Sequence, residues 1–267
     1  MPKTLIITHP GSAHFDEFFA ISLIIAINDD VEFHIDRRDP APDELKNPTV
    51  WVVDIGGEYN PHLKNFDHHQ NLEIPASFMI VADFLGVSSK LSVLPWWAYK
   101  DRIDRFGPIR VGEDMGTGNL VATYSPFEEW YLEYFSKQPD ACRDVMKAFG
   151  KCILEKADEL SSGINYWKNA KRIQVKQKTC LLGETNDLTG AEEYLTRVGI
   201  PFSITVSHDK RGEGWTLKRY HDDPEVDFSK VSDHKDIKFA HKGGFIAKTR
   251  TRLALDKVIE IVDLAVS

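Results

Sequence analysis

Short apolar runs rich in β-branched residues alternate with helical segments over the first part of the chain. Residues 3–8, 31–35 and 49–53 predict three strands, and a shorter run at 65–69 predicts a further strand or its exit. Between the first two, residues 16–26 are strongly apolar and predict a helix. A strand, a turn and a helix in this order predict an α/β fold with a doubly wound, mostly parallel sheet.

The middle of the chain has a helical pattern. Residues 75–85 and 88–105 predict helices, and residues 112–120, which contain three glycines, predict a flexible loop. Residues 126–135 and 140–167 have the apolar spacing of amphipathic helices. These two helices predict a spacer between two domains.

A second alternation of strands and helices follows the spacer. Residues 173–182, 201–207 and 215–220 predict strands, residues 190–197 predict a helix, and residues 252–266 predict a final helix. This pattern predicts a smaller C-terminal α/β domain. The expected division of the chain is 1–125, 126–170 and 171–267.

Composition is that of a soluble globular protein, with 42% hydrophobic and 28% charged residues. No apolar run approaches the roughly 20 residues of a membrane span, so we expect no membrane partner. The first residues resemble a strand and not a signal peptide. The three cysteines lack the spacing of a metal finger and predict reduced thiols in a cytoplasmic protein.

Acidic charge is concentrated in the first part of the chain. The net charge is −8, and residues 1–100 contain 14 Asp and Glu against 7 Lys and Arg, a net charge of −7 for that part. An acidic protein is not expected to coat nucleic acid, because such binding depends on many basic contacts. The acidic excess instead suits a cation site.

Side chains that can bind metal ions follow the expected strands at their carboxyl ends. In chain order they are His9, His14, Asp16, Asp54, Asp67, His68, His69, and Asp101 or Asp104. Carboxylates and imidazoles together suit ions such as Mn²⁺, Fe²⁺, Co²⁺ and Zn²⁺. Side chains at adjacent strand ends could surround two ions about 3.5–4 Å apart, whose shared water becomes a hydroxide that attacks phosphorus.

Each of these residues also has a structural interpretation when it is taken alone. His9 and His14 could be hydrogen-bonding turn residues, and Asp16 could cap a helix. Glu17 could bind metal-bound water, orient a metal ligand without binding the ion, or cap the helix. The metal cluster is the favoured interpretation because the candidates come from separate expected strand ends: His9, His14 and Asp16 from the first, Asp54 from the third, and Asp67, His68 and His69 from the next.

The motifs resemble a known family. Asp67-His68-His69 is the signature of the DHH phosphoesterase superfamily. Together with the segments 9–17 (HPGSAHFDE), 53–59 (VDIGGEY) and 66–70 (FDHHQ), it resembles the melanocyte-proliferating-gene branch, often labelled metal-dependent protein hydrolases. The resemblance covers residues 5–70, and the segment 239–245 is similar to that family's C-terminal glycine-bearing segment.

This resemblance implies a two-domain hydrolase that uses Mn²⁺ or a similar ion and holds its substrate between a catalytic domain and a substrate-binding domain. Relatives of this kind are 3′–5′ exonucleases or act on small phosphoanhydrides and phosphodiesters. Most of the superfamily has Asp where this chain has His14. The implied ligands are His9, His14, Asp16, Asp54, His68, His69 and either Asp104 or Asp101. Asp67 would bind metal or orient the histidines, and the expected catalytic residues are Asp67, His68 and Glu17.

The C-terminal segment 241–252 contains basic residues and no acid. Its glycine pair could let backbone N–H groups approach a phosphate, while basic side chains supply charge. The expected substrate-binding residues are His241, Lys242, Gly243, Gly244, Lys248 and Arg250.

The sequence therefore predicts a metal-dependent phosphoesterase that cleaves short oligonucleotides or nucleotide-like phosphodiesters with a metal-activated water. Two alternatives stay open, a hydrolase of phosphoanhydrides such as polyphosphate and a non-catalytic nucleotide-binding protein. Protein cleavage has little support, because the His-Glu-x-x-His zinc motif is absent. The native ion (Mn²⁺, Mg²⁺, Fe²⁺, Co²⁺ or Zn²⁺), the number of ions and the oligomeric state, a homodimer included, are left open.

Overall fold

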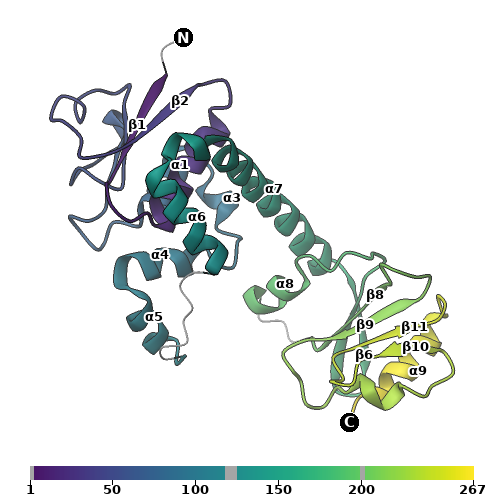
Figure 1. Cartoon of the computed structure of the whole chain (residues 1–267). Coiled ribbons are helices and arrows are strands. Elements are labelled where there is room, and N and C mark those ends of the chain that lie inside the picture. The colour runs from purple at the N-terminus through teal and green to yellow at the C-terminus, as the bar shows by residue number, and fades with distance from the viewer. Residues whose placement is uncertain (1–2, 118–124, 199–201) are drawn as a thin grey trace. The chain divides into compact units, whose positions relative to one another are not determined.

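The computed structural model describes residues 3–117, 125–198 and 202–267 (Figure 1). The chain divides into two compact units, Met1–Asp158 and Glu159–Ser267. Each unit contains a sheet with helices packed against it, so the predicted α/β class is confirmed. Among the described residues, no helix is both long enough and apolar enough to cross a membrane.

The sheet of the first unit has five strands in the order β2-β1-β3-β5-β4. Their bounds are β1 Thr4–Thr8, β2 Phe33–Arg37, β3 Trp51–Val53, β4 Tyr59–Asn60 and β5 Asn65–Phe66. All neighbouring pairs are parallel except β4 with β5. The sheet is therefore mostly parallel, as the sequence predicts.

Strand β1 lies between β2 and β3, and this position determines where a ligand can bind. The chain passes from β2 on one side of β1 to β3 on the other. In the parallel β1–β3 pair, Thr8 lies opposite Val53, so the residues that follow the two strands emerge side by side. Crevices at such a switch point, outside the carboxyl ends of strands, are where open α/β sheets bind ligands.

The helical elements of the first unit are α1 Phe15–Ile27, η1 Pro61–Leu63, α2 Ser77–Phe84, α3 Ser88–Leu91, α4 Trp97–Phe106, α5 Pro108–Asp114, α6 Pro126–Lys137 and η3 Pro139–Cys142. Helix α1 is buried from Asp16 to Ala26, which explains why its sequence is apolar all round.

Two predictions for this part of the chain were wrong in detail. The single helix expected over 88–105 is broken between α3 and α4, in a stretch that contains Pro95, whose ring and missing N–H disfavour a helix interior. Of the loop expected over 112–120, residues 112–114 complete helix α5, and residues 118–120 lie outside the described residues.

Helix α7 (Arg143–Lys168) begins in the first unit and ends in the second, and Figure 1 shows it as one long helix. The two compact units thus meet at residues 158 and 159 inside this helix. The expected division at residues 125 and 170 stays a prediction.

The second unit contains a six-stranded sheet in the order β10-β11-β9-β8-β7-β6. Its elements are β6 Lys171–Val175, β7 Lys178–Leu182, α8 Ala191–Val198, β8 Ile204–His208, β9 Trp215–Arg219, η4 Phe228–Val231, β10 Ile237–Ala240, β11 Ile246–Thr249 and α9 Leu255–Ala265. Strands β7 and β8 are parallel and the other pairs are antiparallel.

The strand predicted over 173–182 is two strands. Lys176 has a left-handed backbone (φ 49°), and β6 and β7 pair as an antiparallel hairpin around it. Periodicity alone cannot find this turn, because Lys176 and Gln177 are not typical turn residues. Strands β10 and β11 were not predicted from the sequence. The final helix is shorter than expected, and residue 201 lies outside the described residues.

Gly150 lets helix α7 pack directly against helix α1. A methyl group at this position would lie 2.4 Å from the carbonyl oxygen of Ser22 and 2.7 Å from Cβ of Ala26. Both distances are well below van der Waals contact, so a larger residue would push the helices apart.

We expect Gly150→Ala to lower the free energy of unfolding by about 1–3 kcal/mol, because overpacking outweighs the better helix propensity of Ala. Ser161→Ala, on an exposed position of the same helix, should change it by less than about 0.5 kcal/mol. Denaturant unfolding of the three proteins measures both values. If Gly150→Ala is as stable as the wild-type protein, the two helices are not in close contact.

Candidate metal centre

The centre begins where β1 and β3 end. His9 follows β1 and Asp54 follows β3, and Nε2 of His9 lies 3.6 Å from Oδ2 of Asp54. Asp54 has a left-handed backbone (φ 59°), a conformation that costs a residue other than glycine about 1–3 kcal/mol. Gly56 and Gly57 continue the turn with φ values of 99° and 68°. The carboxylate of Asp54 is thus held in place by a sharply turned and strained loop.

His68 lies in the middle of three carboxylates. Its Nε2 is 3.1 Å from Oδ2 of Asp104 and 3.4 Å from both Oδ2 of Asp16 and Oδ1 of Asp54. The His68 side chain is only 4% exposed, and neither ring nitrogen makes a well-oriented hydrogen bond with the described residues. These nitrogens are buried polar atoms without a hydrogen-bond partner in the part of the chain that the structure describes.

The structure brings most of the predicted ligands into three overlapping groups. In each group the candidate ligand atoms lie within 4.8 Å of one another. The groups are His9, His14, Glu17 and Asp54; Asp54, His68 and His69; and Asp16, His68 and Asp104. Asp54 and His68 each belong to two groups, so the whole forms one continuous cluster.

Asp16 connects the cluster to helix α2. Its Oδ2 accepts a hydrogen bond from the N–H of Ser77 (2.8 Å) and its Oδ1 accepts one from the N–H of Phe78 (2.6 Å). A carboxylate at a helix N-terminus interacts favourably with the free N–H groups there. Asp16 therefore caps α2 and not its own helix, whose N-cap is His14.

Glu17 is fully buried and holds several parts of the site together. Its Oε1 accepts hydrogen bonds from the N–H of His14 (2.8 Å) and from Nη1 of Arg37 (3.1 Å), and it lies 3.2 Å from Nε2 of His9. The hydrogen bond to Glu17 raises the pKa of His9 to about 9. Oε2 of Glu17 is buried without a hydrogen-bond partner among the described residues.

Sequence reasoning missed Arg37, which lies two residues beyond the strand predicted over 31–35. Its side chain is 5% exposed, and besides Glu17 its guanidinium contacts the backbone oxygen of Ser12 (3.1 Å). Arg37 is the last residue of β2, the strand beside β1. The same strand-end rule that located His9 and Asp54 would have found it, had the end of β2 been placed two residues later.

Asp67 lies beside the three groups and not in them. Its Oδ2 accepts a hydrogen bond from the N–H of Gly57 (2.6 Å), and its Oδ1 lies 2.7 Å from Nδ1 of His69. A carboxylate bonded to one imidazole nitrogen directs the other nitrogen of the ring. Of the two roles expected for Asp67, its contacts match the orientation of a histidine.

Asp101 and Asp104 differ in the groups that they contact. Both oxygens of Asp101 are bonded to Arg105, at 2.5 and 3.0 Å, and Oδ1 also accepts the N–H of Ala76 at 2.8 Å. Asp104 instead faces His68 and lies in one of the three groups. Asp101 joins helix α4 to the start of α2, while Asp104 lies in the cluster.

The electrostatics of the cluster favour a cation. Burial raises the pKa of Asp16, and the carboxylates of Asp54 and Asp104 raise it further. Burial also raises the pKa of Asp54. Burial lowers the pKa of His68, but its three carboxylate neighbours outweigh burial and raise it to about 12. Negative charges crowded in a low dielectric are unfavourable unless positive charge accompanies them.

The donor set fits a divalent cation. It combines buried carboxylate oxygens with imidazole nitrogens, as ions such as Mn²⁺ prefer. The ring nitrogens of His68 and Oε2 of Glu17 are buried without hydrogen-bond partners in the described structure. Buried polar atoms rarely lack a partner, and a bound ion would supply one here.

The expected substrate segment forms the turn between β10 and β11. The N–H of Gly243 donates to Nδ1 of His241 (3.0 Å), and the N–H of Gly244 donates to the carbonyl oxygen of His241 (2.9 Å). Gly244 has a φ of 70°, and a Cβ there would lie 2.2 Å from Oδ1 of Asp227. Both N–H groups are therefore used within the turn, whereas the Lys242 side chain is exposed.

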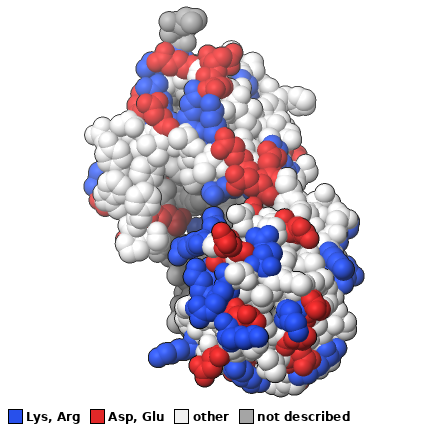
Figure 2. All heavy atoms as spheres, turned by 90° about the vertical axis from the view of Figure 1, so that its right-hand side faces the viewer, with Lys and Arg blue, Asp and Glu red and all other residues white. Residues whose placement is uncertain are grey.

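The two other basic residues predicted for substrate binding also have protein partners. Lys248 pairs with the carboxylate of Asp209, and Nε of Arg250 donates to the carbonyl oxygen of Lys235 (3.0 Å). Figure 2 shows Lys and Arg side chains gathered on a face of the second unit, with acidic side chains among them. The role of these residues in substrate binding stays a prediction.

Comparison with known proteins finds a similarity in the first part of the chain. Residues 5–76 match the MYG1 exonuclease family profile, described as an uncharacterised protein family (UPF0160). The predicted resemblance is thereby confirmed. The matched segment contains the metal-centre residues from His9 to His69 and excludes Asp104.

Individual relatives match over 64 residues of the chain. MYG1 exonuclease from Mus musculus is 42% identical over 64 residues, which cover 24% of this chain and 16% of the mouse protein. MYG1 exonuclease from Homo sapiens is 41% identical, again over 24% and 16% of the two chains. MYG1 protein from Chlamydia trachomatis is 42% identical over 24% of this chain and 21% of its own. The match thus spans about a sixth to a fifth of these relatives.

Among solved structures, RecJ from Thermus thermophilus in complex with Mg²⁺ is similar over 98% of this chain and 49% of that chain. The sequence identity is 12% and the TM-score is 0.33. At this score the similarity carries no conclusion about this chain.

We expect Asp104→Asn and Asp101→Asn to differ in their response to Mn²⁺. In wild-type protein treated with chelator, Mn²⁺ at a hundred times its Kd should stabilise the fold by about 2.7 kcal/mol. Asp104→Asn should lose most of this gain. Asp101→Asn should keep the gain but be about 1.5–3 kcal/mol less stable with or without the ion, because it breaks the bonds to Arg105.

Thermal unfolding of the three proteins, with and without Mn²⁺, measures this difference. An unchanged Mn²⁺ response in Asp104→Asn, together with a lost response in Asp101→Asn, would reverse the assignment of these two residues.

Proposed function

We propose that this chain is a metal-dependent phosphoesterase that hydrolyses phosphodiester bonds of short oligonucleotides or nucleotide-like substrates. One observation carries the proposal: carboxylate and imidazole groups from separate strand ends and from helices α1 and α4 converge within 4.8 Å in three connected groups. Such a cluster is chemically suited to hold divalent ions beside a phosphate.

The comparisons support the same class of activity. Relatives that match over 64 residues include proteins named MYG1 exonuclease, and the segment 5–76, which matches the family profile, carries most of the cluster. An exonuclease hydrolyses phosphodiester bonds. Because the match covers a small part of those relatives, the activity of this chain is inferred from its own cluster and supported by their names.

The groups suggest how two ions would be held. His9, His14 and Asp54 would hold one ion, and Asp16, His68 and Asp104 would hold the other. His69 lies in the group that joins them. Divalent ions at such a site activate water and stabilise the charge that develops on phosphoryl oxygens.

The remaining residues of the centre position these ligands. Arg37 and Glu17 hold His9 and the turn before α1, and Asp67 directs the ring of His69. The bond between His9 Nδ1 and the carbonyl oxygen of Pro10 (3.0 Å) leaves Nε2 of His9 directed at the cluster. Their role is to keep nitrogen and oxygen lone pairs aimed at one place.

The acidic charge of the chain favours short substrates. A net charge of −8 is unsuited to a long polymer, whose binding relies on many basic contacts. Exposed Lys242 in the β10–β11 turn and exposed Arg250 could contact the phosphates of a short substrate. A few such contacts are enough to hold one end of an oligonucleotide.

We expect Asp54→Asn and His68→Ala each to reduce Mn²⁺-dependent hydrolysis by about a hundredfold or more, because each residue belongs to two ligand groups. His62→Ala, at an exposed histidine outside the groups, is the control and should keep wild-type activity. Elemental analysis of protein purified without chelator should show fewer bound ions in the two cluster variants.

The substrate class is tested with a panel of short RNA, short DNA, cyclic dinucleotides and polyphosphate. We expect Mn²⁺-dependent release from the phosphodiesters and a loss of activity on chelation. Faster hydrolysis of polyphosphate would favour the phosphoanhydride alternative. If Mn²⁺-loaded protein binds one of these compounds but hydrolyses none, the chain is a binding protein and the proposal fails.

We expect Lys242→Ala to raise the KM for a short oligonucleotide by roughly two- to fivefold with little change in kcat, because an exposed phosphate contact contributes up to about 1 kcal/mol. Lys257→Ala removes the same charge from helix α9 and serves as the control. Steady-state kinetics on both variants measures the effect. Equal KM values in the two variants would exclude Lys242 from the substrate site.

A further inference from the structure

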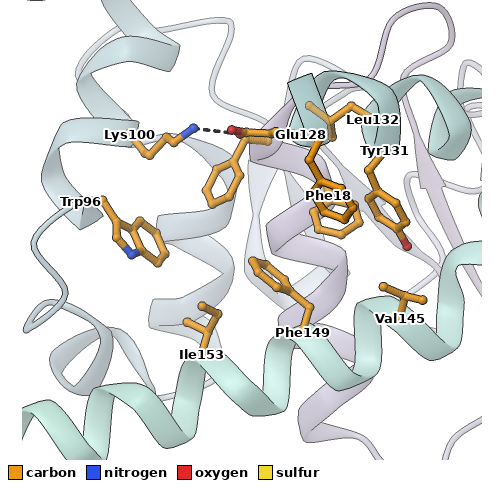
Figure 3. Close-up of a pocket in the computed structure, with 11 residues that line it drawn as sticks. Phe18, Trp96, Lys100, Glu128, Tyr131, Leu132, Val145, Phe149 and Ile153 are labelled. Carbon is orange, nitrogen blue, oxygen red and sulfur yellow. Dashed lines mark hydrogen bonds and ion pairs between the residues drawn. The ribbon is translucent and has the colours of Figure 1, made fainter. Parts of the chain in front are cut away.

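A cavity of about 460 Å³ lies in the first unit between helices α1, α4, α6 and α7 (Figure 3). We call it the aromatic pocket. Its lining is defined by Phe15, Phe18, Trp96, Lys100, Phe127, Glu128, Tyr131, Leu132, Val145, Phe149 and Ile153. Its volume is in the range of about 300–1,000 Å³ that is usual for small-molecule sites.

The walls of the aromatic pocket are almost entirely apolar. Figure 3 shows the rings of Trp96, Phe18 and Phe149 and the side chain of Ile153 around one space. The ring of Phe15 lies 5.6 Å from that of Trp96 in an edge-to-face arrangement. Aromatic rings arranged in this way suit a flat aromatic ligand, which can both stack and make edge contacts.

The two charged residues of the lining, Lys100 and Glu128, form one ion pair. Nζ of Lys100 lies 2.9 Å from Oε1 of Glu128, and Nζ also lies 4.5 Å from the ring centre of Phe15. A hydrogen-bond donor and an acceptor side by side can pair with the edge of a nucleobase, which carries both kinds of group. An alkyl chain has no polar group that could hydrogen-bond to this ion pair.

The aromatic pocket shares part of its wall with the metal centre. Phe15 and Lys100 also line a second cavity, of about 340 Å³, whose other lining residues include Asp16, Asp54 and Asp104. Phe15 and Asp16 are consecutive residues at the start of α1. A ligand with one aromatic part and one phosphate could therefore place them in adjoining cavities.

Two of the residues that line the aromatic pocket are exposed to solvent. Phe127 is 71% exposed and Val145 is 51% exposed. Exposed apolar surface at the rim of a concave site is stabilised when a ligand covers it.

We propose that the aromatic pocket binds a nucleobase of the substrate, adjacent to the phosphate that lies at the metal centre. This inference rests on the proposed phosphoesterase function and specifies its substrate as a compound with a nucleobase beside the cleaved phosphate. The base stacks on the aromatic rings of α1, α6 and α7 and of Trp96 before α4, and its polar edge meets Lys100 and Glu128. Polyphosphate lacks such a group and leaves the pocket unfilled.

The test measures binding of nucleosides, which have no phosphate, to the full chain in the presence of a chelator. Calorimetric titrations with adenosine and guanosine should show saturable binding, and ribose should show none. Because neither metal nor phosphate is present, the result depends on the pocket alone.

Matched variants locate the binding. Phe127→Ala removes an exposed ring that lines the pocket and should weaken nucleoside binding by about fivefold or more, the effect of losing one base–aromatic stack. Trp130→Ala removes an exposed ring of the same helix that is outside the lining, and should leave binding unchanged. Val145→Trp, at an exposed rim position, should fill the pocket and also weaken binding.

Absence of nucleoside binding would overturn the inference. So would equal effects of Phe127→Ala and Trp130→Ala, or binding of decanoate with no binding of nucleosides. These results are separate from the activity assay: nucleoside binding without any hydrolysis would remove the proposed function and keep the pocket, while hydrolysis without nucleoside binding would do the reverse.

Discussion

The first unit depends on keeping negative charges close together, two of them buried (Asp16 and Asp54) and one partly exposed (Asp104). Asp16, Asp54 and Asp104 all face the same nitrogen of His68, at 3.1–3.4 Å. Such an arrangement is electrostatically unfavourable for the protein by itself, and burial raises the pKa of Asp16 and of Asp54. A fold that maintains it must hold each carboxylate firmly, and a divalent ion would supply the missing positive charge.

The surrounding structure provides that support from several elements. The parallel pairing of β1 with β3 places His9 beside Asp54, and the start of helix α2 donates two N–H groups to Asp16. Arg37, at the end of β2, holds Glu17. His9, Asp54 and Asp16 are thus held by strand ends and by backbone N–H groups, so little reorganisation of these residues is needed when an ion and a phosphate arrive.

The centre and the aromatic pocket form two halves of one proposed recognition surface. The start of α1 contributes to both, because Phe15 lines the pocket and Asp16 belongs to the metal cluster. Charge would recognise the phosphate, and stacking would recognise the base. This division explains how an acidic protein could select short nucleotide-containing substrates without a strongly basic groove.

Local motifs were enough to predict the α/β class, the ends of β1 and β3 and the two histidines of the DHH signature. These features depend on residues that are adjacent in the sequence. Local motifs could not decide between Asp101 and Asp104, because both lie on one helical turn. Only the packing of α4 directs Asp101 to Arg105 and Asp104 to His68. The aromatic pocket likewise exists only where helices α1, α4, α6 and α7 meet. Side-chain direction and cavities are properties of packing between elements, and therefore the tertiary structure alone decides them.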